Sequence, residues 1–187
     1  MFRYIAGKNL CKLLKKSIKI LKNNKYPIVN YVLENNKNNK NKDFNKYIDL
    51  LEKTDYNYKI ALKLSSLNFD MNLICKLIES YQLKDISVII DAEDNENNEK
   101  YNNITNDLIK KYNKKSLSVI KTYQLYRKDS LEELCNNINY SKKHKLYFGS
   151  KLVRGAYYNS EKNGNHLYKN KEETDINYNK GIVECLK

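Results

Sequence analysis

Five polar or charged side chains recur at a nearly constant spacing, each at or just beyond the end of a short apolar run. Successive members lie 29, 28, 33 and 27 residues apart, and they are Glu34, Lys63, Asp91, Gln124 and Lys151. Ammonium, carboxylate and amide groups together can hold an anion, orient a polar ligand edge and stabilise a developing negative charge. These residue types therefore predict a binding or catalytic site, provided that the fold brings the ends of the runs together.

The elements that must position these side chains alternate along the chain. Short β-branched or aromatic runs predict strands, and segments whose apolar residues follow a 3.6-residue period predict helices. The predicted strands cover residues 26–33, 58–67, 86–93, 116–124 and 147–157, and the predicted helices cover residues 44–53, 71–82, 103–112, 130–143 and 174–186. Strands that alternate with helices indicate a parallel sheet with right-handed crossovers.

The N-terminal region has two interpretations. Leu10, Leu13, Leu14, Ile18 and Leu21 recur at helical spacing, which favours a packed helix. The alternative is a mitochondrial transit peptide, because residues 1–33 are basic and contain no acidic side chain.

The repeat length favours one fold class. A strand–helix unit takes roughly 30 residues, and in a (β/α)8 barrel the catalytic groups come from the carboxyl ends of several strands. A doubly wound sheet would place a glycine-rich turn after the first strand, but "VLENNKNN" contains no glycine. Eight units need about 240 residues, whereas the chain has 187. We therefore predict an α/β fold, an incomplete (β/α)8 TIM-like barrel of about five βα units, as one partial domain over residues 1–187.

Composition removes several other classes of function. The net charge of +13 suits a polyanion, but the lysines are scattered among asparagines, so we predict no nucleic-acid partner. The four cysteines and two histidines lack metal-ligand spacing, so we predict no metal site and free, partly buried thiols. The polar segments 35–42 and 94–103 are predicted to be loops.

The stretch "GSKLVRGAYYNSE", residues 149–161, carries the densest signal. In a strand, Lys151 and Gly155 share one face while Leu152 and Arg154 share the other. A glycine there lets the backbone approach a ligand closely. The alternative is a structural strand with a glycine bulge.

Seven motifs together resemble one known family. "YIAGKNL", "NYVLEN", "ALKLSSL", "IIDAED", "KTYQLYRKD", "GSKLVRGAYYNSE" and "TDINYNK" occur in this order between about Tyr4 and Lys187. They are similar to motifs of the flavin-dependent proline dehydrogenases. The resemblance implies a distorted (β/α)8 barrel that holds FAD at the carboxyl ends of its strands. It also implies oxidation of L-proline to 1-pyrroline-5-carboxylate by hydride transfer to FAD, the first step of proline degradation to glutamate.

The resemblance also implies a role for each matched residue. It assigns catalysis to Asp91 and Lys151, and substrate binding to Lys63 and Tyr157. The expected cofactor contacts are Ala92, Gln124, Arg154, Gly155 and Ala156. Simpler interpretations stay open: Lys63 as an edge lysine that extends to water, Asp91 as a helix cap, and Gln124 as a solvent-exposed amide.

One departure from the family concerns the last third of its pattern. Its His-Asn strand end and its Arg-Arg-x-x-Glu helix, whose arginines clamp the substrate carboxylate, are missing. We therefore expect the last three or so βα units to be absent, and the chain to be a fragment, a split product or a degenerate copy. A non-catalytic fragment that needs a second chain to complete the barrel is the alternative function, and the isolated chain is expected not to turn over proline.

Location and electron acceptor follow only from the resemblance. Eukaryotic relatives work at the mitochondrial inner membrane and pass electrons to a quinone, so both are expected here. Because the match begins near Tyr4, no clear presequence is expected, and a cytoplasmic location stays open.

Overall fold

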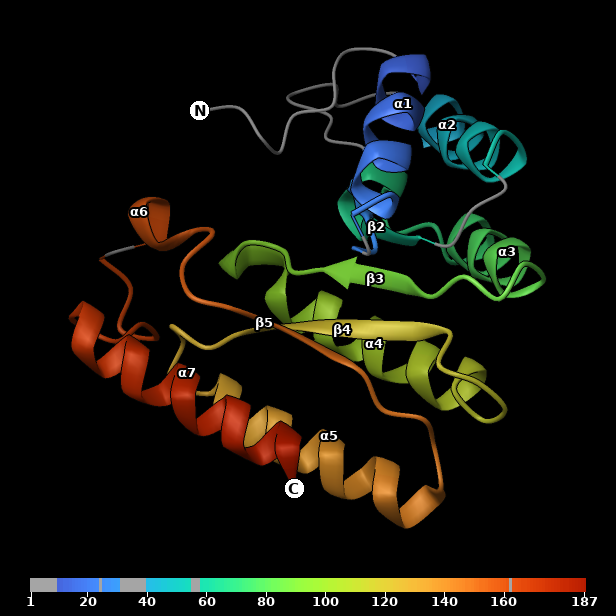
Figure 1. The fold of residues 1–187 in the computed structure, drawn as a ribbon. Helices are drawn as coiled ribbons and strands as arrows, with labels where there is room; N and C mark the ends of the chain where they lie inside the picture. The colour runs from blue at the N-terminus through green and yellow to red at the C-terminus, as the bar shows by residue number, and fades with distance from the viewer. Residues whose placement is uncertain (1–9, 24, 31–39, 55–57, 162) are drawn as a thin grey trace. The chain divides into compact units, whose positions relative to one another are not determined.

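The computed structural model describes residues 10–23, 25–30, 40–54, 58–161 and 163–187 (Figure 1). The chain divides into two compact units, Met1–Val88 and Ile89–Lys187. In the first unit β1 lies beside β2, and in the second unit β3, β4 and β5 follow one another in chain order. The predicted residue Glu34 lies outside the described residues.

The first unit holds two parallel strands and their helices. Ile28 of β1 lies opposite Lys59 of β2, and α2 packs against α3. The N-terminal helix predicted from leucine spacing is confirmed as α1. The elements are α1 (Leu10–Leu21), β1 (Ile28–Asn30), α2 (Lys40–Glu52), β2 (Lys59–Lys63), η1 (Leu64–Leu67) and α3 (Met71–Gln82).

The second predicted strand is shorter than expected. It ends at Lys63 because residues Leu64–Leu67 form a 3-10 turn, in which the Ser66 hydroxyl donates to the Lys63 carbonyl at 2.7 Å. Both leucines of this turn are fully buried. A buried apolar turn has the composition of a strand, which is why residues 58–67 read as one continuous element.

The two polar segments predicted as loops are partly helical. Residues 35–39 lie outside the described residues, but α2 already begins at Lys40 and α4 begins at Asn98. The Asp94 carboxylate accepts from the Asn97 N–H at 3.1 Å and so starts the turn that leads into α4. Polar residues are common in a first helical turn because they satisfy its free N–H groups. The prediction of loops there was therefore wrong for these residues.

The second unit holds the remaining strand–helix repeats. Strands β4 and β5 are parallel, with Thr122 opposite Lys151 and Gln124 opposite Val153. Strand β3 begins at Val88, the last residue of the first unit. The elements are β3 (Val88–Asp91), η2 (Asn95–Asn97), α4 (Asn98–Tyr112), β4 (Val119–Gln124), α5 (Ser130–His144), β5 (Ser150–Val153), α6 (Tyr158–Glu161) and α7 (Lys171–Leu186).

One face of β4 and β5 packs on the helices. Leu152 of β5 joins a buried cluster with Tyr123 of β4 and with Leu134 and Ile138 of α5. Helix α7 lies along α5 (Figure 1) and also contacts β5. Because successive strand residues alternate in direction, Lys151 faces away from this helix layer, which is the alternation predicted from the sequence.

Asn113 fixes the opposite, amino-terminal ends of the same two strands. Its Nδ2 donates to the carbonyls of Val119 and Tyr147 at 2.8 and 2.9 Å. Its Oδ1 accepts from the N–H groups of Ser118 and Val119 at 3.2 and 2.8 Å. One buried amide therefore holds the entry to β4 against the entry to β5.

Tyr101 of α4 inserts its hydroxyl beside the inner strands. The hydroxyl lies 2.7 Å from the Thr122 carbonyl and 3.3 Å from the Ile90 carbonyl, and it accepts from the Thr122 N–H at 3.0 Å. The ring is fully buried, and this burial raises the pKa of Tyr101 well above its usual range. The phenol therefore stays neutral and serves β3 and β4 as both donor and acceptor.

Replacing Tyr101 with phenylalanine is expected to lower the free energy of unfolding by about 1–3 kcal/mol. The buried Thr122 N–H and carbonyl lose their shared partner, and an unsatisfied buried group costs about that amount. Urea titration followed by circular dichroism measures the change. Tyr147→Phe is the matched control because that ring is 53% exposed, and an equal loss in both variants would contradict the assignment.

The structure also shows the state of the described thiols and the character of the described helices. Cys75 and Cys135 are half-buried thiols outside any disulfide, as predicted, whereas the Cys185 thiol is exposed. Within the described part of the chain, no helix combines the length and the apolar character that crossing a bilayer requires.

Candidate functional site

The structure places Asp91 and Lys151 in direct contact. Asp91 is the last residue of β3, Lys151 lies in β5, and their Oδ1 and Nζ atoms are 2.5 Å apart. The carboxylate is 12% exposed and the ammonium 35% exposed, so the pair is sheltered but reachable. A charge-assisted hydrogen bond of this kind holds Lys151, two residues before the end of β5, against Asp91 at the carboxyl end of β3.

Gln124 is held by its own network at the end of β4. Its Nε2 donates to the Glu93 carbonyl at 3.0 Å and lies 3.4 Å from the Asn98 Oδ1. Its Oε1 accepts from the hydroxyl of Tyr126, whose pKa is raised chiefly by burial. The amide is 3% exposed, so it is not the solvent-exposed glutamine of the simpler interpretation. Its oxygen still has a second lone pair that can accept a hydrogen bond.

Tyr157 connects the segment after β5 to the end of β3. Its hydroxyl donates to the Ala92 carbonyl at 3.3 Å, and its N–H lies 3.4 Å from the Tyr126 hydroxyl. Gly155 has φ of 156°, a conformation that L side chains rarely adopt. Gly155 and Ala156 are exposed, so their backbone is open to a ligand.

Arg154 points to a different side of the segment. Its Nη1 donates to Asp175 of α7 at 3.0 Å, and its guanidinium lies 4.7 Å from the centre of the Tyr178 ring. Hydrogen bonds from Lys171 first, and then from Arg154, lower the pKa of Asp175. The Arg154 side chain therefore joins α7 rather than the group formed by Asp91, Gln124, Lys151 and Tyr157.

Lys63 belongs to the first unit, whereas the site residues above belong to the second. It is the last residue of β2, and its side chain is exposed. The position at a strand end agrees with the sequence pattern, while its approach to the other site residues stays a prediction.

Two residues of the site were not singled out from the sequence. Tyr126 orients Gln124, and its position two residues further along the "TYQLY" motif is the signal that could have indicated it. The Thr122 hydroxyl is buried without a hydrogen-bond partner, on the strand pair next to Lys151. No sequence signal distinguishes that threonine from an ordinary strand residue.

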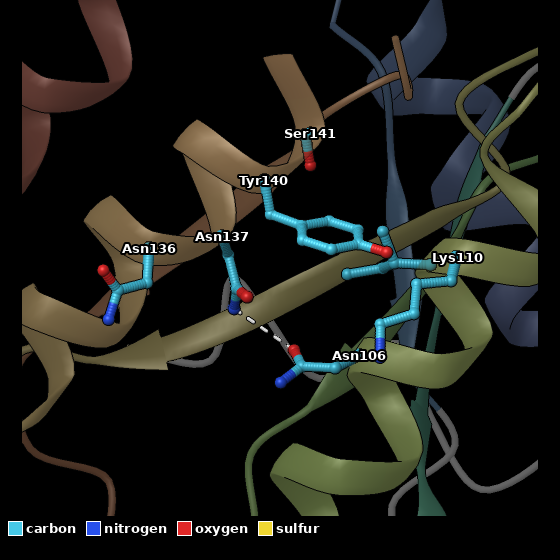
Figure 2. Close-up of a pocket in the computed structure, with 7 residues that line it drawn as sticks. Asn106, Lys110, Asn136, Asn137, Tyr140 and Ser141 are labelled. Carbon is cyan, nitrogen blue, oxygen red and sulfur yellow. Dashed lines mark hydrogen bonds between the residues drawn. The ribbon is translucent and has the colours of Figure 1, made fainter. Parts of the chain in front are cut away.

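A separate depression of about 240 Å³ lies between α4 and α5 (Figure 2). Asn137 donates to Asn106 across it at 3.1 Å, and the Lys110 ammonium lies 5.7 Å from the centre of the Tyr140 ring. None of the predicted site residues lines this depression. It is therefore a feature of the helix layer and not of the strand ends.

Comparison with known proteins identifies the family. A family model described as "Proline dehydrogenase" matches residues 14–187. The chain is 31% identical over 110 residues to "Proline dehydrogenase 1, mitochondrial" of Drosophila melanogaster, which covers 55% of this chain and 16% of that protein. It is 36% identical over 111 residues to "Probable proline dehydrogenase, mitochondrial" of Schizosaccharomyces pombe, which covers 59% of this chain and 22% of that protein.

A solved structure shows the same fold. The crystal structure of proline utilization A from Bdellovibrio bacteriovorus superposes with a TM-score of 0.82 and 19% identity, covering 94% of this chain and 23% of that one. This likeness bears out the predicted α/β architecture, an incomplete (β/α)8 TIM-like barrel with five strand–helix units. The chain matches less than a quarter of the length of each of these three proteins. On the match over residues 14–187, the chain belongs to the proline dehydrogenase family.

Proposed function

We propose that this chain supplies the flavin- and proline-facing strands of an enzyme that oxidises L-proline to 1-pyrroline-5-carboxylate. The observation that carries the proposal is the Asp91–Lys151 pair beside Tyr157, at strand ends of a proline dehydrogenase family fold. We propose that the two compact units together, residues 1–187, form one partial barrel domain.

The residues present suit FAD in their chemistry. Lys151 offers an ammonium, Gln124 a fixed amide oxygen, and Gly155 a backbone without a side chain. The Thr122 hydroxyl, which is buried without a hydrogen-bond partner opposite Lys151, offers one more polar group on the same strand pair. Ala92 and Ala156 are further proposed cofactor contacts. Arg154 is proposed to contribute through its backbone, because its side chain binds Asp175 of α7. When bound, FAD would supply the acceptor for the hydride that leaves proline.

The remaining residues have proposed roles that follow from their charge or their hydrogen bonds. The Lys151 ammonium is placed to stabilise negative charge that develops during the reaction, and Asp91 keeps that ammonium in place. Tyr157 lines the proline pocket through its bond to Ala92. Lys63 supplies a cation for the proline carboxylate. Holding the reacting carbon close and in the right orientation is the main contribution of such groups.

Titration of the purified chain with FAD tests the cofactor part of this proposal. The expected result is a complex in stoichiometric amounts with a shifted visible flavin spectrum. Lys143→Met, which removes an exposed charge from α5, should bind FAD as the natural chain does. A colourless chain that leaves the flavin spectrum unchanged at every ratio would contradict the proposal.

A second candidate function follows from the share of the relatives that is matched. The aligned regions cover 16% and 22% of the two curated relatives described above. A chain of this extent could act as a non-catalytic fragment, or as a partner of a second chain that completes the barrel. Proline-dependent bleaching of bound flavin by the isolated chain would exclude this candidate. Bleaching only after a second chain with an Arg-Arg-x-x-Glu helix is added would support it.

The acceptor and the location are proposals of the same kind. The curated relatives carry the word mitochondrial in their names, and we propose a mitochondrial location with a quinone as electron acceptor. Fractionation of cells that express the tagged full-length protein tests the location, and recovery in the cytosol alone would overturn it.

A further inference from the structure

Glu161, the last residue of α6, receives contacts from three separate segments of the second unit. The Asn95 N–H, just after β3, donates to its Oε1 at 2.7 Å. Its Oε2 lies 3.1 Å from the His166 Nε2 and 3.9 Å from the Nη1 of Arg127, which follows β4. The carboxylate is only 10% exposed. One nearly buried acid therefore joins the segments that follow three neighbouring strands.

Helix α6 directly extends the segment that contains Gly155 and Tyr157. The Glu161 N–H and the Ser160 hydroxyl both bond to the Tyr157 carbonyl, at 3.0 and 2.9 Å. The Tyr158 N–H lies 3.4 Å from the Gly155 carbonyl. A helix of four residues is far too short to be stable by its own hydrogen bonds. Its position must therefore come from side chains that bind it to the rest of the unit.

The surroundings show which group depends on Glu161. Arg127 keeps other partners, because it also contacts both carboxylate oxygens of Asp129 at 3.2 and 3.3 Å and the Asn95 side chain at 2.9 Å. The Asn95 backbone N–H, in contrast, donates to the Glu161 carboxylate. Loss of the carboxylate would leave the arginine paired but would remove the contacts that join α6 to Asn95 and Arg127.

We propose that Glu161 is a positioning residue that fixes residues 155–157 for ligand binding by anchoring α6 to the segments after β3 and β4. It acts through Tyr157 and the backbone of Gly155, without contacting the ligand itself. The ligand class, FAD with proline, rests on the proposed function. The anchoring itself is a property of the chain without ligand, which makes the two ideas separable.

Hydrogen exchange of the unliganded chain tests the anchor directly. In Glu161→Gln, the amides of Asn95 and of residues 157–161 are expected to exchange about tenfold faster, because local opening becomes easier. Glu172→Gln is the matched control, since that acid is exposed in the first turn of α7 and should leave these amides unchanged. Unchanged exchange in Glu161→Gln would overturn the proposal.

Two further measurements complete the design. If the chain binds FAD, Glu161→Gln should weaken binding about tenfold, equivalent to about 1.4 kcal/mol, with little change in melting temperature; equal affinity would count against the anchor. If the natural chain binds no FAD, the proposed function fails while the exchange result still decides the anchor. Should Glu161→Gln not fold, Glu161→Asp keeps the charge but shortens the side chain, which withdraws the carboxylate from the Asn95 N–H and from Arg127. It is then expected to raise exchange about threefold, and no change there would overturn the anchor.

Discussion

Replacing Lys151 with methionine is expected to slow reduction of bound flavin by about 100- to 1,000-fold, the usual cost of losing one preorganised group that stabilises developing charge. The ammonium is the cationic member of the Asp91 pair, and methionine keeps a similar length without the charge. The same change leaves Asp91, 12% exposed, without this cation, so negative charge would face the site instead. The loss of the cation and the remaining negative charge of Asp91 both slow reduction of the flavin.

Anaerobic reduction followed by flavin absorbance measures this effect. Proline is the reductant, added together with a second chain that carries the Arg-Arg-x-x-Glu helix. Lys143→Met controls for the loss of one positive charge from the exposed end of α5. Equal reduction rates in Lys151→Met and the natural chain would remove Lys151 from the proposed mechanism.

Replacing Glu133 with glutamine is expected to lower the free energy of unfolding by about 3 kcal/mol, because removing one partner of a buried ion pair leaves the other charge uncompensated. Lys121 is fully buried on the helix face of β4, and its Nζ lies 2.5 Å from the Glu133 carboxylate and 2.8 Å from the Asn106 oxygen. The rings of Tyr101 and Tyr123 lie 5.7 and 5.4 Å from the same nitrogen. These contacts reduce the loss in free energy of unfolding, but none of them replaces the negative charge of Glu133.

The loss should also depend on pH in a definite direction. Burial lowers the pKa of Lys121, and Glu133 partly offsets this by raising it. The folded state therefore binds the proton less tightly than the unfolded state, so this group opposes folding at neutral pH. Stability rises as the pH increases from the folded-state pKa towards the unfolded value of about 10.4. Without Glu133 the folded-state pKa falls further, so the destabilisation of the variant should shrink as the pH becomes alkaline.

Urea titrations at neutral and alkaline pH separate this mechanism from a general loss of helix stability. Glu132→Gln is the matched control, because Glu132 lies in the same first turn of α5 but is exposed. The double variant Lys121→Met/Glu133→Gln should recover most of the loss, since the pair then carries no buried charge. A destabilisation that is the same at every pH would contradict the assignment to Lys121.

The repeat of strand and helix was predictable because its signals are local. Apolar runs bounded by polar residues located the strand ends, and Asp91, Gln124 and Lys151 do lie at or near those ends in β3, β4 and β5. The alternation in β5 also held, since Leu152 packs on the helices while Lys151 contacts Asp91. These features depend on residues that are close in sequence.

The parts that could not be predicted depend on distant partners. The Arg154 side chain contacts α7 because Asp175 binds its guanidinium and the Tyr178 ring packs against it. Both partners lie 21 residues or more further along the chain. Lys121 lies inside the helix layer because Glu133 and Asn106 surround it, although a strand lysine alone suggests a solvent-facing position. Gln124 is likewise buried only because Tyr126 and the Glu93 carbonyl satisfy its amide.

The amide of Asn113 has a consequence for how this protein can change over evolutionary time. It fixes the alignment of β4 and β5 from the ends of those strands that carry no site residue. Mutations in the segments after Gln124 and Val153 can therefore accumulate without shifting one strand past the other. Such a division lets the residues at the site change while the scaffold is retained.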